Sequence, residues 1–260
     1  MFRSLILVAV SCMMVGSAHA AVKTKKLSYK HGDLECIGYL AWDDAVQGPR
    51  PGVLVVHEWW GLNDYARKRA EELARLGYIA LAADMYGEGK TTEHPTEAGQ
   101  MATKVRSNLS DWRKRATAAL EVLRSQPECD KTKLAAVGYC FGGSTALQLA
   151  YTGADLKAVA TFHAALPVPT EAEAKQIKAE ILICHGADDK FIPEKVIKDF
   201  RAALDKGQVK YDFVSYEGAV HSFTVADADR HNNPGMKYNK KADEDSWDRM
   251  KALLAKNLGK

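Results

Sequence analysis

Residues 134–143 read LAAVGYCFGG, an apolar run that leads through a Gly-x-Cys-x-Gly-Gly turn towards a helical pattern. Such an order predicts a buried strand, a tight turn at Cys140 and a helix directly after it. The residue at the tip of this turn adopts a positive φ, and small neighbours let the chain close around it. Five cysteines and 19 glycines in 260 residues would produce Gly-x-Cys-x-Gly by chance only ~0.03 times. We therefore interpret Cys140 as a nucleophile rather than as an inert buried thiol.

Backbone N–H groups around this turn are candidates for an oxyanion hole. Phe141 N–H opens the helix behind the nucleophile, where the helix dipole also favours a thiolate. Residues 54–63, LVVHEWWGLN, would end another buried strand, and we assign the second donor to Trp59 N–H. His57 and Glu58 could begin a zinc-binding His-Glu-x-x-His helix, but Gly61 stands where the second histidine is required. We therefore predict no metal site and no cofactor.

An acid and a base follow the nucleophile in the chain. Asp188 and Asp189 follow the apolar run 181–184 after a three-residue turn, and His221 follows the last strand-like segment. The order nucleophile, acid, histidine is that of catalytic triads on parallel sheets, and ligands gather at the carboxyl ends of such strands. Spacing alone leaves Asp188 and Asp189 open. His185 is the nearest competitor of His221, and its place before a glycine turn favours a structural role.

Strand and helix patterns alternate along the chain after an early hairpin. Continuous apolar or alternating runs predict strands over 27–30, 34–41, 51–57, 78–83, 133–139, 156–162, 180–184 and 210–216. Helical patterns predict helices over 63–76, around 112–123, over 142–151, over 193–204 with Pro193 at the first helical position, and near 247–258. Residues 84–95 are polar and are expected to form a loop. We therefore expect one α/β domain over residues 21–260, with a mostly parallel sheet, an antiparallel N-terminal hairpin and helices on both faces.

The first twenty residues are typical of a signal peptide. Arg3 gives a positive start, residues 5–16 are largely apolar, and residues 18–20 form a small-x-small cleavage motif. The apolar run is too short to span a membrane. We expect cleavage after Ala20 and a periplasmic or secreted protein.

Composition argues against several other classes of protein. Hydrophobic residues make up 47% of the chain and charged residues 27%, and the net charge of +3 is dispersed. These values predict a globular domain that binds neither nucleic acid nor, once the signal is removed, a membrane. Cys36, Cys129, Cys140 and Cys184 remain after cleavage, too few for a disulfide scaffold, and the pairing of the others stays open. We expect a monomer or weak homodimer.

These motifs make the chain resemble the dienelactone hydrolase family, small cysteine hydrolases of the α/β-hydrolase fold. The resemblance rests on the early hairpin and on four segments, HEWWGLN at 57–63, GYCFGG at 138–143, Gly-x-x-Asp-x-x-Ile-Pro at 186–193 and HSF at 221–223. It implies a triad of Cys140, His221 and Asp189, and it favours Asp189 over Asp188. It also implies that Glu58 lies near the resting thiol and takes its proton when substrate arrives.

The chain departs from this family at the residues that hold a substrate carboxylate. The founding enzymes carry an arginine a few residues after the catalytic histidine, whereas the nearest arginine here is Arg230. A second family arginine follows the fourth strand, but residues 85–103 contain none and Arg106 lies further on. The resemblance therefore does not imply dienelactone itself as the substrate.

Taken together, the triad and the resemblance predict an exported hydrolase that cleaves a lactone or short carboxylic ester through an acyl-thioester. We place Trp60, Trp112 and His163 in a rather apolar substrate pocket. Two alternatives keep the fold without this chemistry. One is a thiol protein that senses peroxides or electrophiles through Cys140, and the other is a non-catalytic binding protein.

Overall fold

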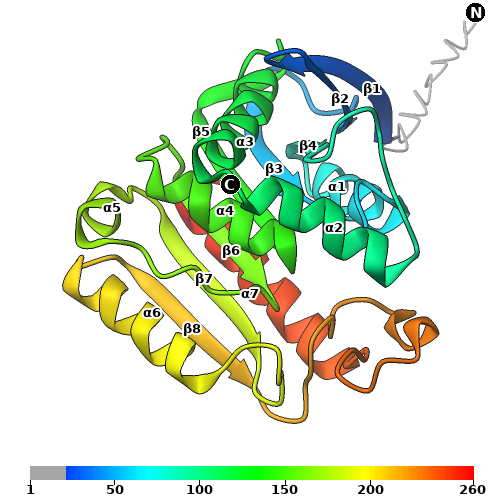
Figure 1. Ribbon diagram of the computed structural model, residues 1–260. Coiled ribbons are helices and arrows are strands. Elements are labelled where there is room, and N and C mark those ends of the chain that lie inside the picture. Colours follow the sequence, from blue (N-terminus) through cyan, green and yellow to red (C-terminus); the bar gives the residue numbers. More distant parts are fainter. Residues whose placement is uncertain (1–21) are drawn as a thin grey trace, which may run out of the picture.

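One sheet of eight strands organises residues 22–260, the part of the chain that the computed structural model describes (Figure 1). The predicted signal peptide, residues 1–20, lies outside the described residues. The strand order is β1-β2-β4-β3-β5-β6-β7-β8. The strands are β1 Val22–His31, β2 Leu34–Asp43, β3 Arg50–Val56, β4 Ile79–Ala83, β5 Cys129–Tyr139, β6 Ala158–Phe162, β7 Glu180–Gly186 and β8 Tyr211–Tyr216. β2 pairs antiparallel with β1 and β4, and every other pair of neighbouring strands is parallel.

Helices cover both faces of this sheet. They are α1 Asp64–Arg75, α2 Pro95–Arg106, α3 Leu109–Arg124, α4 Phe141–Tyr151, α5 Glu171–Gln176, α6 Glu194–Lys206 and α7 Lys240–Leu258, with a short 3-10 helix, η1, at Ala228–His231. The apolar sides of α1 and α7 bury one face, and those of α2, α3, α4 and α6 contribute to the core on the other. The predicted fold class, a mostly parallel sheet with an antiparallel hairpin between two helical layers, is confirmed.

Two helices were not predicted, and one helix start was wrong. α2 begins where the polar segment 84–95 ends and shares only Pro95 with it. Residues 96–106 gave no clear helical pattern, because the buried side of α2 consists only of Ala98, Ala102 and Val105. α5 begins with a reciprocal capping box between Thr170 and Glu173, a signal that could have been found in the sequence. Pro193 is the N-cap residue of α6 rather than its first helical residue, with extended backbone angles.

The turn between β5 and α4 has the predicted geometry. Cys140 lies at its tip with φ of 52°, and its N–H donates to Phe162 O at 2.9 Å, which ties the turn to β6. A Cβ atom at Gly138 would lie 2.1 Å from Gly142 O, and one at Gly142 would lie 2.1 Å from Val56 O. Backbone surrounds both positions, so only glycine allows α4 to start this close to the end of β3.

Replacing Gly142 by alanine is therefore expected to destabilise the protein strongly. The added methyl group can be accommodated only if α4 moves away from β3, which we expect to cost about 3 kcal/mol or more. Urea denaturation followed by circular dichroism measures this loss. Gly99→Ala is the matched control, because a Cβ there meets only Trp59 at an ordinary 3.8 Å and alanine favours a helix by about 1 kcal/mol. Equal stability of Gly142→Ala and wild type would contradict the close approach.

Candidate active site

The N-terminus of α4 presents Cys140 and an unused backbone donor. Cys140 is half-buried, and none of the backbone hydrogen bonds in residues 22–260 uses the N–H of Phe141 or of Trp59. Trp59 follows β3, and its carbonyl accepts a 2.9 Å hydrogen bond from the Tyr86 hydroxyl. His57 steadies the same loop, because its Nδ1 pairs with Glu58 O at 2.5 Å and its Nε2 accepts from Met85 N–H at 3.2 Å. The N–H groups of both predicted oxyanion donors thus have no backbone acceptor among the described residues.

His221 and Asp189 form a close buried pair. His221 Nδ1 lies 2.7 Å from Asp189 Oδ2, and Asp189 also accepts from Phe191 N–H at 2.9 Å. Asp188, by contrast, is exposed and offers His221 no contact. Asp189 follows β7 and His221 follows β8, so the two parallel strands bring their ends together. The geometry therefore selects Asp189 between the two candidates.

The proton affinity of His221 reflects its two partners. Burial lowers the pKa of His221, but the Cys140 thiolate and the hydrogen-bonded Asp189 carboxylate outweigh burial and raise that pKa to about 10. The imidazole can thus hold a proton beside a cysteine thiolate. A nucleophile, a base and a group that orients the base are the three parts that covalent acyl transfer needs.

Glu58 is buried and is the second residue after β3, which ends at Val56 beside the elbow. Its Oε1 accepts a 3.3 Å hydrogen bond from Ser222 Oγ and lies 3.8 Å from His163 Nδ1. Burial raises the pKa of the Glu58 carboxyl to about 7, although His221 and Ser222 oppose this effect. Among the described residues, no hydrogen bond joins Glu58 to Cys140. In this conformation the carboxylate is directed to the loop that follows His221.

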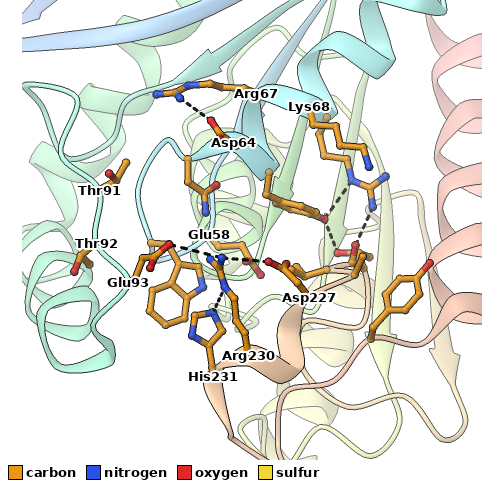
Figure 2. Close-up of a pocket in the computed structure, with 18 of the residues that line it drawn as sticks. Glu58, Asp64, Arg67, Lys68, Thr91, Thr92, Glu93, Asp227, Arg230 and His231 are labelled. Carbon is orange, nitrogen blue, oxygen red and sulfur yellow. Dashed lines mark hydrogen bonds and ion pairs between the residues drawn. The ribbon is translucent and has the colours of Figure 1, made fainter.

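Glu58 also lines a cavity of about 1070 Å³ (Figure 2). Arg230 projects into it and pairs with Asp227 at 3.1 Å and with Glu93 at 3.6 Å. Trp60 lines the cavity and stacks on His231 with 4.1 Å between ring centroids. Charged and hydroxyl side chains make up most of the lining, so this cavity is polar, and neither Cys140 nor His221 lines it.

The three predicted pocket residues lie in different places. Trp60 lines the polar cavity, but Trp112 and His163 do not. Trp112 is buried in the core, where it donates to Thr145 Oγ1 at 2.9 Å and stacks on Phe141. His163 is completely buried, with its ring centroid 5.1 Å from that of His221. Trp112 therefore packs against the turn through Phe141, and His163 packs against the base His221.

Arg106 is a candidate for binding a substrate carboxylate, although it lies beyond the segment in which the family arginine was expected. Its guanidinium lies 5.2 Å from the ring centroid of Phe141, directly after the nucleophile, and its side chain is exposed. The helix α2, which was not predicted, folds back and delivers its last residue to this position. The sequence signal that could have indicated this helix end is a basic residue in the last turn of an amphipathic segment.

Three further features of residues 22–260 concern metal ligands, paired cysteines and membrane-spanning helices. No group of three or more His, Cys, Asp or Glu side chains there could hold a metal ion. Cys36, Cys129, Cys140 and Cys184 are unpaired in this structure, and burial raises the pKa of Cys36 and of Cys129 to about 11. None of the helices described is long and apolar enough to cross a membrane.

An elbow between β5 and α4, followed by an acid after β7 and a histidine after β8, defines a hydrolase of the α/β-hydrolase fold. More particularly, the chain belongs to the dienelactone hydrolase family, which matches residues 37–258. The resemblance stated from the motifs is thereby confirmed.

Relatives and solved structures cover most of the chain. A Synechocystis protein named "Putative carboxymethylenebutenolidase" is 30% identical over 258 residues, covering 91% of this chain and 98% of its own length. A Saccharolobus solfataricus protein of the same name is 29% identical over 80% of this chain and 90% of its own. The structure of a dienelactone hydrolase-like promiscuous phosphotriesterase from metagenomic libraries is 40% identical, with a TM-score of 0.89 and coverage of 91% and 99%.

Proposed function

We propose that this protein is an exported hydrolase of lactones or short carboxylic esters that acts through Cys140, His221 and Asp189. The observation that carries the proposal is the 2.7 Å contact between His221 and Asp189, with Cys140 at the tip of a positive-φ turn close enough to raise the pKa of His221. Export rests on the signal-like residues 1–20. N-terminal sequencing of the periplasmic protein tests it, and a first residue of Ala21 is expected.

The reaction divides into two steps. The Cys140 thiolate attacks the carbonyl carbon, the C–O bond to the alcohol breaks, and protonated His221 gives its proton to the departing oxygen. Neutral His221 then removes a proton from water, whose oxygen attacks the thioester carbon and releases the acid and the thiolate. The N–H groups of Phe141 and Trp59 hold the oxyanion in both steps, each contributing about 3 kcal/mol.

Glu58 is proposed to take the proton of the Cys140 thiol when substrate binds, a role that the family resemblance implies. A burial-raised pKa of about 7 suits a proton acceptor that must also release the proton. The carboxylate has to turn from Ser222 towards Cys140 to act. Until then the nucleophile stays a thiol, which resists oxidation in an oxidising compartment because oxidation proceeds through the thiolate.

A panel of lactones and p-nitrophenyl esters tests the proposal directly. We expect hydrolysis with a burst of alcohol equal to the enzyme concentration, and an acyl group on Cys140 detectable by mass spectrometry after acid quenching. A thiol sensor would label with dimedone at Cys140 but show no burst. A non-catalytic binding protein would show ligand-dependent thermal shifts and hydrolyse no member of the panel.

Neutral phosphotriesters are a second substrate class. The 40% identical relative is named a promiscuous phosphotriesterase. A phosphoryl oxygen can accept from the same two N–H donors as an ester carbonyl. Hydrolysis of paraoxon by the wild-type protein, and its loss in Cys140→Ala, would support this activity, and turnover that is unchanged in Cys140→Ala would exclude it.

Arg106 is expected to set the preference for anionic substrates. It is exposed beside the elbow and has no ion pair among the described residues, so an ester that carries a carboxylate can bind it. For Arg106→Gln we expect kcat/KM to fall roughly tenfold for such an ester and less than about twofold for its uncharged isostere. Arg230→Gln is the control, because Asp227 and Glu93 already offset the Arg230 charge. Equal losses on both esters would contradict this role.

A further inference from the structure

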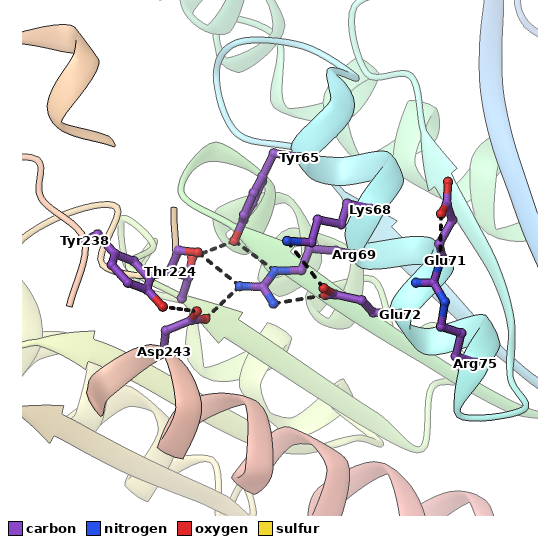
Figure 3. A network of polar contacts seen from close by, with 9 residues as sticks. All are labelled: Tyr65, Lys68, Arg69, Glu71, Glu72, Arg75, Thr224, Tyr238 and Asp243. Carbon is purple, nitrogen blue, oxygen red and sulfur yellow. Dashed lines mark hydrogen bonds and ion pairs between the residues drawn. The ribbon is translucent and has the colours of Figure 1, made fainter. Parts of the chain in front are cut away.

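A chain of hydrogen bonds runs from α1 towards Glu58 through residues that the proposed mechanism does not use. Arg69 Nε donates to Tyr65 Oη at 3.2 Å, and Tyr65 Oη lies 2.6 Å from Thr224 Oγ1 (Figure 3). Thr224 Oγ1 in turn lies 2.8 Å from His163 Nε2. His163 Nδ1 has no hydrogen-bond partner among the described residues, and it points to Glu58 Oε1 at 3.8 Å.

Arg69 and His163, the two ends of this hydrogen-bonded series, are both held firmly in place by the surrounding structure. Arg69 is 8% exposed and is held by Asp243 at 2.7 Å, by Glu72 at 3.0 Å and by the Thr224 carbonyl at 3.0 Å. His163 is fully buried and has a φ of 38°, a strained backbone conformation for a residue other than glycine. Such strain persists only where the surroundings determine the position of the residue.

The directions of the hydrogen bonds follow from Arg69 at one end and from giving each buried hydroxyl proton an acceptor. A guanidinium can only donate, so Tyr65 Oη accepts from Arg69. Among the described residues Thr224 Oγ1 is the one acceptor in hydrogen-bond contact with Tyr65 Oη, so we assign the Tyr65 proton to that contact. The Thr224 hydroxyl, having accepted from Tyr65, is left to donate to His163 Nε2. His163 is neutral, since burial, His221 and Arg69 hold its pKa well below the usual value. With Nε2 as an acceptor, the single ring proton is on Nδ1 and faces Glu58.

We infer that Arg69, Tyr65 and Thr224 hold His163 in its Nδ1–H tautomer, and that this N–H stabilises the ionised form of Glu58. The opposite tautomer would place a nitrogen lone pair against the carboxylate and would fit only a protonated Glu58. His163, Thr224 and Tyr65 are thus positioning residues. They keep Glu58 able to accept the Cys140 proton, and this effect on the rate rests on the proposed function.

Other charged groups around Glu58 act in both directions. His221 and Arg230 favour the carboxylate, as does the Ser222 hydroxyl, whereas Asp227 opposes it. Arg69 and Tyr65 of α1 line the same cavity as Glu58. To these groups the hydrogen-bonded series from Arg69 to His163 adds a second buried donor beside the Ser222 hydroxyl, the His163 Nδ1–H. Loss of that donor should raise the pKa of Glu58, so a larger fraction of the protein would carry a neutral Glu58 below pH 7.

The tautomer of His163 can be measured without any substrate. In ¹⁵N-histidine-labelled protein, long-range ¹⁵N–¹H couplings distinguish a protonated Nδ1 from a protonated Nε2, and His163→Asn assigns the signals. We expect Nδ1–H in the wild-type protein. An Nε2–H tautomer would overturn the inference, and this result stands whether or not the protein hydrolyses esters.

Tyr65→Phe tests the consequence for Glu58. We expect the acid limb of kcat/KM to move up by roughly 0.5 to 1 pH unit, so that activity at pH 6 falls about threefold to tenfold while activity at pH 9 is unchanged. Thr224→Val should do the same, and Thr224→Ser should restore the wild-type profile. Tyr151→Phe is the matched control, because it removes a buried hydroxyl that bonds to Pro167 O at 2.7 Å, outside the chain. A uniform loss at all pH values, or an unmoved limb in Tyr65→Phe, would overturn the inference.

Discussion

Cys140→Ala is expected to abolish ester hydrolysis, lowering kcat by roughly 10⁴-fold or more. The reason is chemical, because no other group at the tip of the elbow can form the acyl intermediate. The burst of alcohol should disappear as well, and stopped-flow absorbance with p-nitrophenyl acetate measures both effects. Any rate that remains reflects the oxyanion donors and substrate binding alone.

A control separates the loss of the nucleophile from the loss of a thiol. Cys184 is a free, fully buried cysteine in β7, and burial raises its pKa well above the usual value. Cys184→Ala should therefore keep the burst and most of the activity. If Cys140→Ala retained full esterase activity with its burst, the assignment of the nucleophile would be wrong.

The second large effect is expected at the base and its partner. His221→Gln should lower kcat by about 10²–10⁴-fold, since neither the leaving alcohol nor the attacking water would exchange a proton with the protein. Asp189→Asn should lower it by a similar factor, because an amide can hold His221 Nδ1 in the wrong tautomer. Steady-state kinetics on one ester compares the two.

Asp188→Asn is the matched control for this pair. Asp188 is exposed, whereas Asp189 contacts His221 at 2.7 Å, so the neighbouring substitution should change kcat less than about twofold. NMR titration gives a second measurement. The Asp189 carboxylate raises the pKa of His221, so Asp189→Asn should lower that pKa. Equal kinetics in the two asparagine variants would contradict the choice of Asp189.

Local sequence patterns predicted the sheet and most of its helices, and they failed where burial is slight. α3 and α7 are long and show clear apolar faces. α2 buries only two alanines and a valine, so its sequence shows no clear apolar face. The short α5 buries Ala174 alone. Tertiary contacts decide whether such weakly amphipathic segments fold as helices, because their own burial contributes little.

In the candidate site, too, some features follow from local sequence patterns and others depend on tertiary contacts. The order of nucleophile, acid and histidine could be predicted, because each residue follows a recognisable strand and parallel strands end at one edge of the sheet. The positions of Trp112, His163 and Arg106 could not. Trp112 packs behind the turn, His163 faces Glu58, and Arg106 reaches the elbow only because α2 folds back. Residue type indicated none of these orientations.

The elbow at Cys140 was determined by the sequence itself, since a positive φ between close backbone neighbours is a local requirement that its glycines meet. The choice of Asp189, the direction of the Glu58 carboxylate and the polarity of the cavity were decided only by the tertiary structure. These properties depend on contacts between distant parts of the chain, and Ser222 and Glu58, which share a hydrogen bond, are separated by 164 positions. Spacing along a chain specifies which residues end strands, but only packing specifies which side chains then meet.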